Sequence, residues 1–113
     1  MRSKNHFELR GFVGNQPEIK TTQNGRKVVN LRLATDQIHR GNKSGETEKT
    51  TLWHTVALWG KKAEITQRYI NKGALIAVEG RIKPRSYQNP QGETIYTLDL
   101  VVDSLDIILN KEQ

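Results

Sequence analysis

Two tryptophans in one short run carry the most specific chemistry in this sequence. The run Thr51–Gly60, TLWHTVALWG, is rich in β-branched and aromatic residues and has no glycine or proline before its end, which predicts a strand. Because side chains alternate across a strand, they divide into two faces: Leu52, His54, Val56 and Leu58 on the first, and Trp53, Thr55, Ala57 and Trp59 on the second. If the aliphatic face packs into the core, both indole rings face outward and can stack on unstacked nucleobases. The alternative is that both faces are buried, with the tryptophan face under a helix or another subunit.

The charge of the chain points to a polyanionic partner. Lys and Arg number 18 and Asp and Glu number 12, so the formal net charge is +6. Composition alone fits a merely soluble basic domain equally well. The candidate phosphate contacts lie on or near the tryptophan strand and in the flanking loops: Arg32, Arg40, Lys43, Lys49, Lys61, Lys62, Arg81, Lys83 and Arg85. For any one of them an ordinary solvated charge is an equally good interpretation.

Catalytic and metal-binding chemistry finds little support in the motifs. The histidines His6, His39 and His54 are far apart in the sequence and lack ligand spacing. The absence of cysteine excludes disulfides, thiolate zinc sites and cysteine catalysis. No glycine-rich phosphate loop and no nucleophile constellation are suggested. We therefore predict a binding protein with no metal, no cofactor and no enzymatic activity.

The elements before the tryptophan strand follow from the apolar pattern. We expect a first strand at His6–Val13 with Phe12 on its outer face, an extended piece at Glu18–Thr22, a turn at Asn24-Gly25 and a second strand at Lys27–Thr35. The inner residues expected on these two strands are Phe7, Leu9, Val13, Val29, Leu31 and Leu33. Asp36–Glu48 is polar and contains glycine, so we expect an exposed loop there.

The elements after the tryptophan strand are a helix and two strands. Lys61–Asn71 is expected to be helical, with an apolar stripe of Ala63, Ile65, Tyr69 and Ile70. A strand at Ala74–Lys83 should direct Ile76, Val78 and Ile82 inward, and Pro84–Gly92 should form a basic hairpin loop. The last strand, Glu93–Leu109, is expected to bend near Asp103.

This order of elements predicts an all-β fold with one short helix. Three strands, a helix and two further strands are the layout of the OB-fold, a five-stranded Greek-key barrel. At 113 residues, the whole of 1–113 is expected to be one such domain. The fold binds oligonucleotides across its second and third strands, and the tryptophan strand is the third.

Long segments of the chain also resemble the bacterial single-stranded DNA-binding protein family. The resemblance is carried by GFVGNQPEIKTTQNGRKVVNLRLAT, by TLWHTVALWGKKAEITQRYINKGALIAVEGRI and by YTLDLVV, and it extends over Phe7–Leu109. It implies an OB-fold that assembles into a homotetramer and wraps single-stranded DNA in replication, recombination and repair. It also implies base stacking on Trp53, Trp59 and Tyr87, with His39 at a fourth stacking position.

Two residues are expected at a subunit interface. His54 matches a histidine of the family and is assigned to an interface or structural role, and Phe12 has the outward parity that would let it pack between subunits. The family's acidic C-terminal tip has no counterpart in the ending ILNKEQ, so recruitment of partner enzymes through such a tail is not expected.

The expected location is the cytoplasm of a bacterium, in association with the nucleoid. No apolar run is long enough to span a membrane, and the charged start MRSKNHFELRG does not resemble a secretory signal. Two other functions stay open at this point: an RNA-binding OB-fold chaperone, and an OB-fold adaptor of replication restart that acts through protein contacts.

Overall fold

The computed structural model describes residues 2–40 and 47–111 of the chain. The elements are β1 (Phe7–Val13), β2 (Lys20–Thr21), β3 (Lys27–Arg40), β4 (Thr47–Trp59), α1 (Lys61–Tyr69), β5 (Leu75–Gln88) and β6 (Thr94–Leu109). The nine residues of α1 form the only helix in the described ranges, and no helix there is long and apolar enough to cross a membrane.

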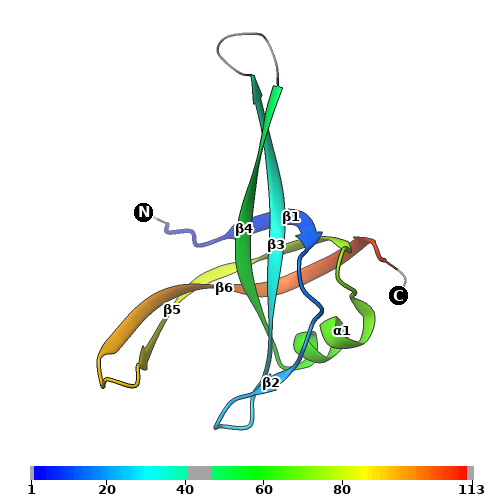
Figure 1. Ribbon diagram of the computed structural model, residues 1–113. Helices are drawn as coiled ribbons and strands as arrows, with labels where there is room; N and C mark the ends of the chain where they lie inside the picture. The colour runs from blue at the N-terminus through cyan, green and yellow to red at the C-terminus, as the bar shows by residue number, and fades with distance from the viewer. Residues whose placement is uncertain (1, 41–46, 112–113) are drawn as a thin grey trace.

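Five of the strands close into a barrel. The sheet order is β1-β5-β6-β4-β3-β2, and an additional pairing of β1 with β3 joins the two sides. In that closing pair Phe12 lies opposite Ala34 and Val13 opposite Leu33. All pairings are antiparallel except β4 with β6. The expected five-stranded barrel with one helix is confirmed, and β2 adds a two-residue strand at the edge of β3 (Figure 1).

The core is built from the aliphatic faces of the barrel strands. Leu31 and Leu33 on β3 and Val56 and Leu58 on β4 are fully buried, as the alternation predicts. Ile76 and Val78 on β5 and Val13 on β1 join the same cluster. Burial of this apolar surface is the main stabilising term for the barrel, and it determines which face of each strand is left for other contacts.

The inward stripe of α1 differs from the prediction. Ala63, Thr66 and Ile70 are fully buried, whereas Ile65 is 40% and Tyr69 51% exposed. Residues spaced by three share a helix face, which joins Ala63 to Thr66 and excludes Ile65. Ile70 follows the helix in an extended conformation. The Thr66 hydroxyl can be buried because it donates a hydrogen bond to the Lys62 carbonyl, 2.7 Å away.

Two hairpins extend beyond the barrel where the sequence predicted loops. The β3–β4 ladder continues to the pair Arg40 and Thr47, and the β5–β6 ladder to Gln88 and Thr94. In Figure 1 they project as two arms, β3–β4 at the top and β5–β6 at the lower left. The loop predictions for Asp36–Glu48 and Pro84–Gly92 were therefore wrong at 36–40, 47–48 and 84–88, and 41–46 lie outside the described residues. An arm has no buried face, so it needs no apolar alternation and is held mainly by its ladder hydrogen bonds.

The arms also explain two apolar residues that were expected in the core. Leu52 has the inward parity of Leu58 but is 42% exposed, and Ile82 is 37% exposed. Leu52 pairs with Thr35 and Ile82 with Leu100, at positions where each hairpin leaves the barrel. The alternation of side chains along a strand therefore predicts which face a residue lies on, but not where along the strand the barrel ends.

The expected bend near Asp103 is a bulge. Glu79 pairs with Ser104 and Gly80 with Val102, which leaves Asp103 without a partner in the ladder. A Cβ on Gly80 would lie 1.9 Å from the carbonyl oxygen of Val101, so only glycine fits this close approach of the two strands.

Two leucines on β4 test the assignment of the core. Leu58→Ala should lower the free energy of unfolding by about 2–5 kcal/mol, because a fully buried side chain is removed. Leu52→Ala is the matched control, since Leu52 shares the strand and parity but is 42% exposed, and its loss should be about 1 kcal/mol or less. Urea denaturation measures both. Equal losses would contradict the position assigned to the barrel boundary.

Candidate nucleic-acid interface

The outer face of β3 and β4 presents both tryptophans. Cross-strand partners share a face of the sheet, and the register pairs Ala34 with Trp53 and Val28 with Trp59. Trp53 is 51% exposed and Trp59 is partly exposed. Trp53 and Trp59 are six positions apart on β4, so their Cα atoms lie about 20 Å from each other along the strand. We call this outer face of β3–β4, from Trp53 to Trp59, the aromatic platform.

The ring of Trp53 lies against backbone and beneath an arginine. The guanidinium of Arg32 lies over the ring, 4.5 Å from its centroid. A Cβ on Gly14 would lie 2.4 Å from Cζ3 of the same ring, so the absence of a side chain at Gly14 lets the indole approach the chain after β1. The structure thus adds Gly14, which the sequence interpretation did not single out, to the residues that position Trp53.

The segment that follows β1 is fastened to the edge of β3. The Gly14 amide donates to the Arg32 carbonyl at 2.8 Å. The Asn15 side chain accepts a hydrogen bond from the Arg32 amide at 2.8 Å and donates one to the Asn30 carbonyl at 3.1 Å. These bonds hold the backbone against which Trp53 rests.

Trp59 has a similar arginine partner. The guanidinium of Arg26, just after the Asn24-Gly25 turn, lies over the ring of Trp59, 4.5 Å from its centroid. Arg26 was not among the predicted contacts, because its position over Trp59 depends on the fold of the β2–β3 turn.

The other two predicted stacking residues lie on the arms. Tyr87 on β5 is 45% exposed, and the Arg85 guanidinium lies 5.2 Å from its ring centroid. His39 on β3 has the parity of the core-facing residues of that strand, so alternation puts it on the face opposite Trp53. Its Nε2 lies 3.5 Å from a carboxylate oxygen of Glu48. The structure therefore does not bring His39 to the platform face.

The predicted phosphate contacts separate into paired and unpaired cations. Three form ion pairs: Lys49 with Asp36 at 3.3 Å, Arg81 with Asp103 at 3.0 Å and Arg85 with Asp99 at 2.6 Å. Within the described part of the chain, Lys61, Lys62 and Lys83 have no carboxylate within 4.0 Å, and Arg32 contacts Trp53 instead. Arg40 ends β3 and Lys43 lies outside the described residues, so the side chains of these two are not placed.

Two of these acidic partners, Asp36 and Asp103, are held in the ionised form. The hydrogen bond from Arg81 lowers the pKa of Asp103, and the charges of Arg81, Lys62 and Lys83 lower it further. The pKa of Asp36 is lowered first by a hydrogen bond from Thr51 and then by Lys49. Carboxylates with lowered pKa values stay charged at neutral pH, so their paired cations are partly neutralised as phosphate ligands.

The two residues expected at a subunit interface have distinct surroundings. His54 is partly buried, and its Nε2 lies 2.8 Å from the hydroxyl of Thr35 on the neighbouring strand. Phe12 is 49% exposed and pairs with Ala34, which in turn pairs with Trp53. Phe12 therefore faces the same side of the sheet as Trp53.

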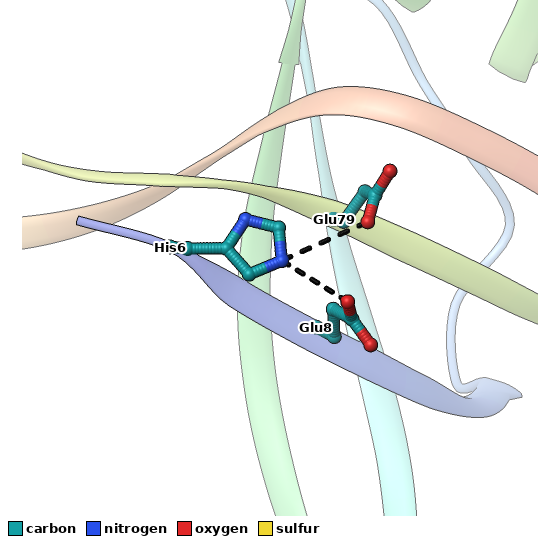
Figure 2. Close-up of side chains that lie close together, drawn as sticks. All are labelled: His6, Glu8 and Glu79. Carbon is teal, nitrogen blue, oxygen red and sulfur yellow. Dashed lines mark hydrogen bonds and ion pairs between the residues drawn. The ribbon is translucent and has the colours of Figure 1, made fainter. Parts of the chain in front are cut away.

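A group of possible metal ligands lies away from the platform, on β1, on β5 and at the residue that precedes β1. His6 Nε2 is 3.1 Å from a Glu8 oxygen and 3.7 Å from a Glu79 oxygen (Figure 2). The three donor atoms lie within 4.8 Å of one another and are of types that bind divalent cations. Sequence spacing missed the group because Glu79 arrives from another strand, directly opposite Glu8.

Comparisons with known proteins show the family of the chain. The model of the single-strand binding protein family matches residues 4–108. A protein of Rhizobium meliloti (strain 1021), described as a single-stranded DNA-binding protein, is 36% identical over 108 residues, which are 95% of this chain and 62% of that relative. The chain thus spans less than two thirds of the length of this relative.

Two solved structures share the fold. The Plasmodium falciparum SSB complex with single-stranded DNA superposes with a TM-score of 0.76 at 24% identity, covering 98% of both chains. A deletion mutant of the single-stranded DNA binding protein from Thermus aquaticus has a TM-score of 0.76 at 26% identity, covering 93% of this chain and 50% of that one. The OB-fold is therefore shown by topology and by structural likeness.

The contact between Gly14 and Trp53 gives a test of how the platform is built. In a Trp59→Phe background, where Trp53 is the only tryptophan, Gly14→Ala should change the indole emission and raise its quenching by acrylamide. The reason is that the added methyl group would lie 2.4 Å from the ring and must displace it. The same change in a Trp53→Phe background should leave the emission of Trp59 unaltered. An unchanged Trp53 signal would show that Gly14 does not seat the ring.

Proposed function

The chain belongs to the single-strand binding protein family, and from that premise we propose that it binds single-stranded DNA through the aromatic platform. The observation that carries the proposal is the pair of outward tryptophans, each with a guanidinium over its ring at 4.5 Å, in a chain of net charge +6. When a base stacks on an indole ring at a protein surface, the apolar face of the ring is removed from water, which favours binding.

The division of labour between rings and cations follows from their chemistry. Trp53 and Trp59, with Tyr87 on the β5–β6 arm, stack on bases, which every base permits because each has a π face. The unpaired cations Lys61, Lys62 and Lys83, together with Arg32, contact phosphates and release counterions. Binding of this kind tolerates any sequence and rejects duplex, whose bases are already stacked. The proposed roles are therefore protection of single strands in replication, recombination and repair, at the nucleoid of a bacterial cytoplasm, without catalysis.

We also propose that copies of the chain assemble, in line with the homotetramer expected from the family. The register supports a role for the first strand. β1 pairs with β5 from Phe7 to Phe12 but with β3 only at Phe12 and Val13. The edge of β1 before Phe12 is thus open along most of its length, and an open edge can pair with another strand.

The test of function uses the tryptophans as reporters. A single-stranded oligonucleotide should quench their fluorescence and bind far more tightly than a duplex of the same length, because only unpaired bases reach the rings. Affinity should fall with salt with a log–log slope of about −0.7 per neutralised phosphate. A competing RNA oligonucleotide that displaces DNA at equal concentration would support the RNA-binding alternative instead.

The contribution of each ring is measured with a labelled oligonucleotide. Trp53→Ala and Trp59→Ala should each weaken binding by about 1–3 kcal/mol. Tyr69→Ala is the matched control, since Tyr69 is 51% exposed, like Trp53, but lies on α1. A loss in the control as large as that in the tryptophan variants would refute the platform.

The state of assembly is tested separately by light scattering. At micromolar concentration the mass should be about four times the 12.9 kDa of one chain. Arg10→Pro removes a backbone donor from the open edge of β1 and should shift the distribution toward smaller species. A monomeric mass for the unaltered chain would rule out the tetramer.

A further inference from the structure

A hollow at the Trp59 end of the platform has the composition of a nucleotide site. It measures about 400 Å³, and the side chains that matter in its lining are Arg26, Trp59, Lys62, Lys83, Arg85 and Asp99. It forms where the β2–β3 turn, the start of α1 and the base of the β5–β6 arm meet beside the end of β4. Resting on the function proposed above, we propose that this hollow binds one nucleotide, with Arg26 as a phosphate ligand that the sequence did not reveal.

The hollow contains more cations than carboxylates, and its carboxylates already form ion pairs. Four cations line it against two carboxylates, Asp99 and Asp103. Each carboxylate already has a partner, because Asp99 pairs with Arg85 at 2.6 Å and Asp103 with Arg81 at 3.0 Å. Within the described residues, Arg26, Lys62 and Lys83 have no carboxylate within 4.0 Å. The hollow therefore has an excess of positive charge that a phosphate can neutralise.

Arg26 is held in place by its own turn. The Thr22 amide donates to the Arg26 carbonyl at 2.8 Å, and the Arg26 amide donates to the Thr22 hydroxyl at 3.2 Å. Gly25, with φ of 81°, supplies the left-handed residue that this tight reversal requires. The turn thus fixes the backbone, and the long side chain alone must move when a ligand arrives.

The position of the guanidinium suggests how a nucleotide enters. At 4.5 Å from the centroid, Arg26 covers a face of Trp59 in the free protein. A planar base can insert between guanidinium and indole, or displace the guanidinium toward the phosphate of the same nucleotide. Both movements keep Arg26 in contact with the ligand and bring its charge near Lys62 and Lys83. In the free protein the contact with Trp59 therefore holds the Arg26 guanidinium close to the proposed phosphate position.

The experiment measures affinity for a labelled single-stranded oligonucleotide as a function of salt. Arg26→Gln should lower the affinity about tenfold at low salt and make the log–log salt slope shallower by about 0.7, since one phosphate contact is lost. Arg26→Lys should keep the slope, because it keeps the charge, and recover only part of the affinity. Arg68→Gln is the matched control, because Arg68 also lies over an aromatic ring, Tyr69 at 5.4 Å, but on α1.

The outcomes separate this proposal from the function on which it rests. If the unaltered chain binds DNA but Arg26→Gln behaves as Arg68→Gln does, the nucleotide site is wrong and the platform stands. A rise in affinity with Arg26→Gln would show that the guanidinium only shields the ring, and it would also overturn the proposal. If the unaltered chain shows no affinity for single-stranded DNA at any salt concentration, the proposed function is wrong, and the nucleotide site that rests on it is wrong as well.

Discussion

The alternation of side chains along β4 is the constraint on which the rest of the molecule depends. Val56 and Leu58 must face inward to complete the barrel core, and strand geometry then forces Trp53 and Trp59 outward. A shift of one residue in register would bury the indoles and expose the leucine. The same interaction that stabilises the barrel therefore creates the aromatic platform.

Charge pairing refines the surface that packing creates. Asp36, Asp99 and Asp103 form ion pairs with three cations that the sequence predicts as phosphate ligands, and these pairs partly neutralise them. The remaining candidate phosphate ligands are a few unpaired lysines and the arginines that lie over aromatic rings. An arginine over a ring is weakly hydrated and planar, so it can pass from the ring to a base or phosphate at small cost. The free protein thus keeps both kinds of contact close together.

Much of the fold and part of the site could be predicted from the sequence. Strong alternation predicted the buried faces of β3 and β4, and the glycine and asparagine signals predicted the turns. The arms were missed because Asp36–His39 and Pro84–Gln88 have no buried face, and a ladder of backbone hydrogen bonds leaves little trace in side-chain type. Arg26, Gly14 and the His6 group were missed because each depends on a contact between segments far apart in the chain.

The central claim is that single-stranded DNA lies on the outer face of β3–β4, and nuclear magnetic resonance of the two indole N–H groups tests it most directly. With ¹⁵N-labelled protein, adding a single-stranded oligonucleotide should move both the Trp53 and the Trp59 signals. Backbone signals of the outer side of α1 around Tyr69 should stay in place. If both indole signals remain unmoved while α1 or the outer face of β1–β5 responds, the DNA binds elsewhere and the account is wrong.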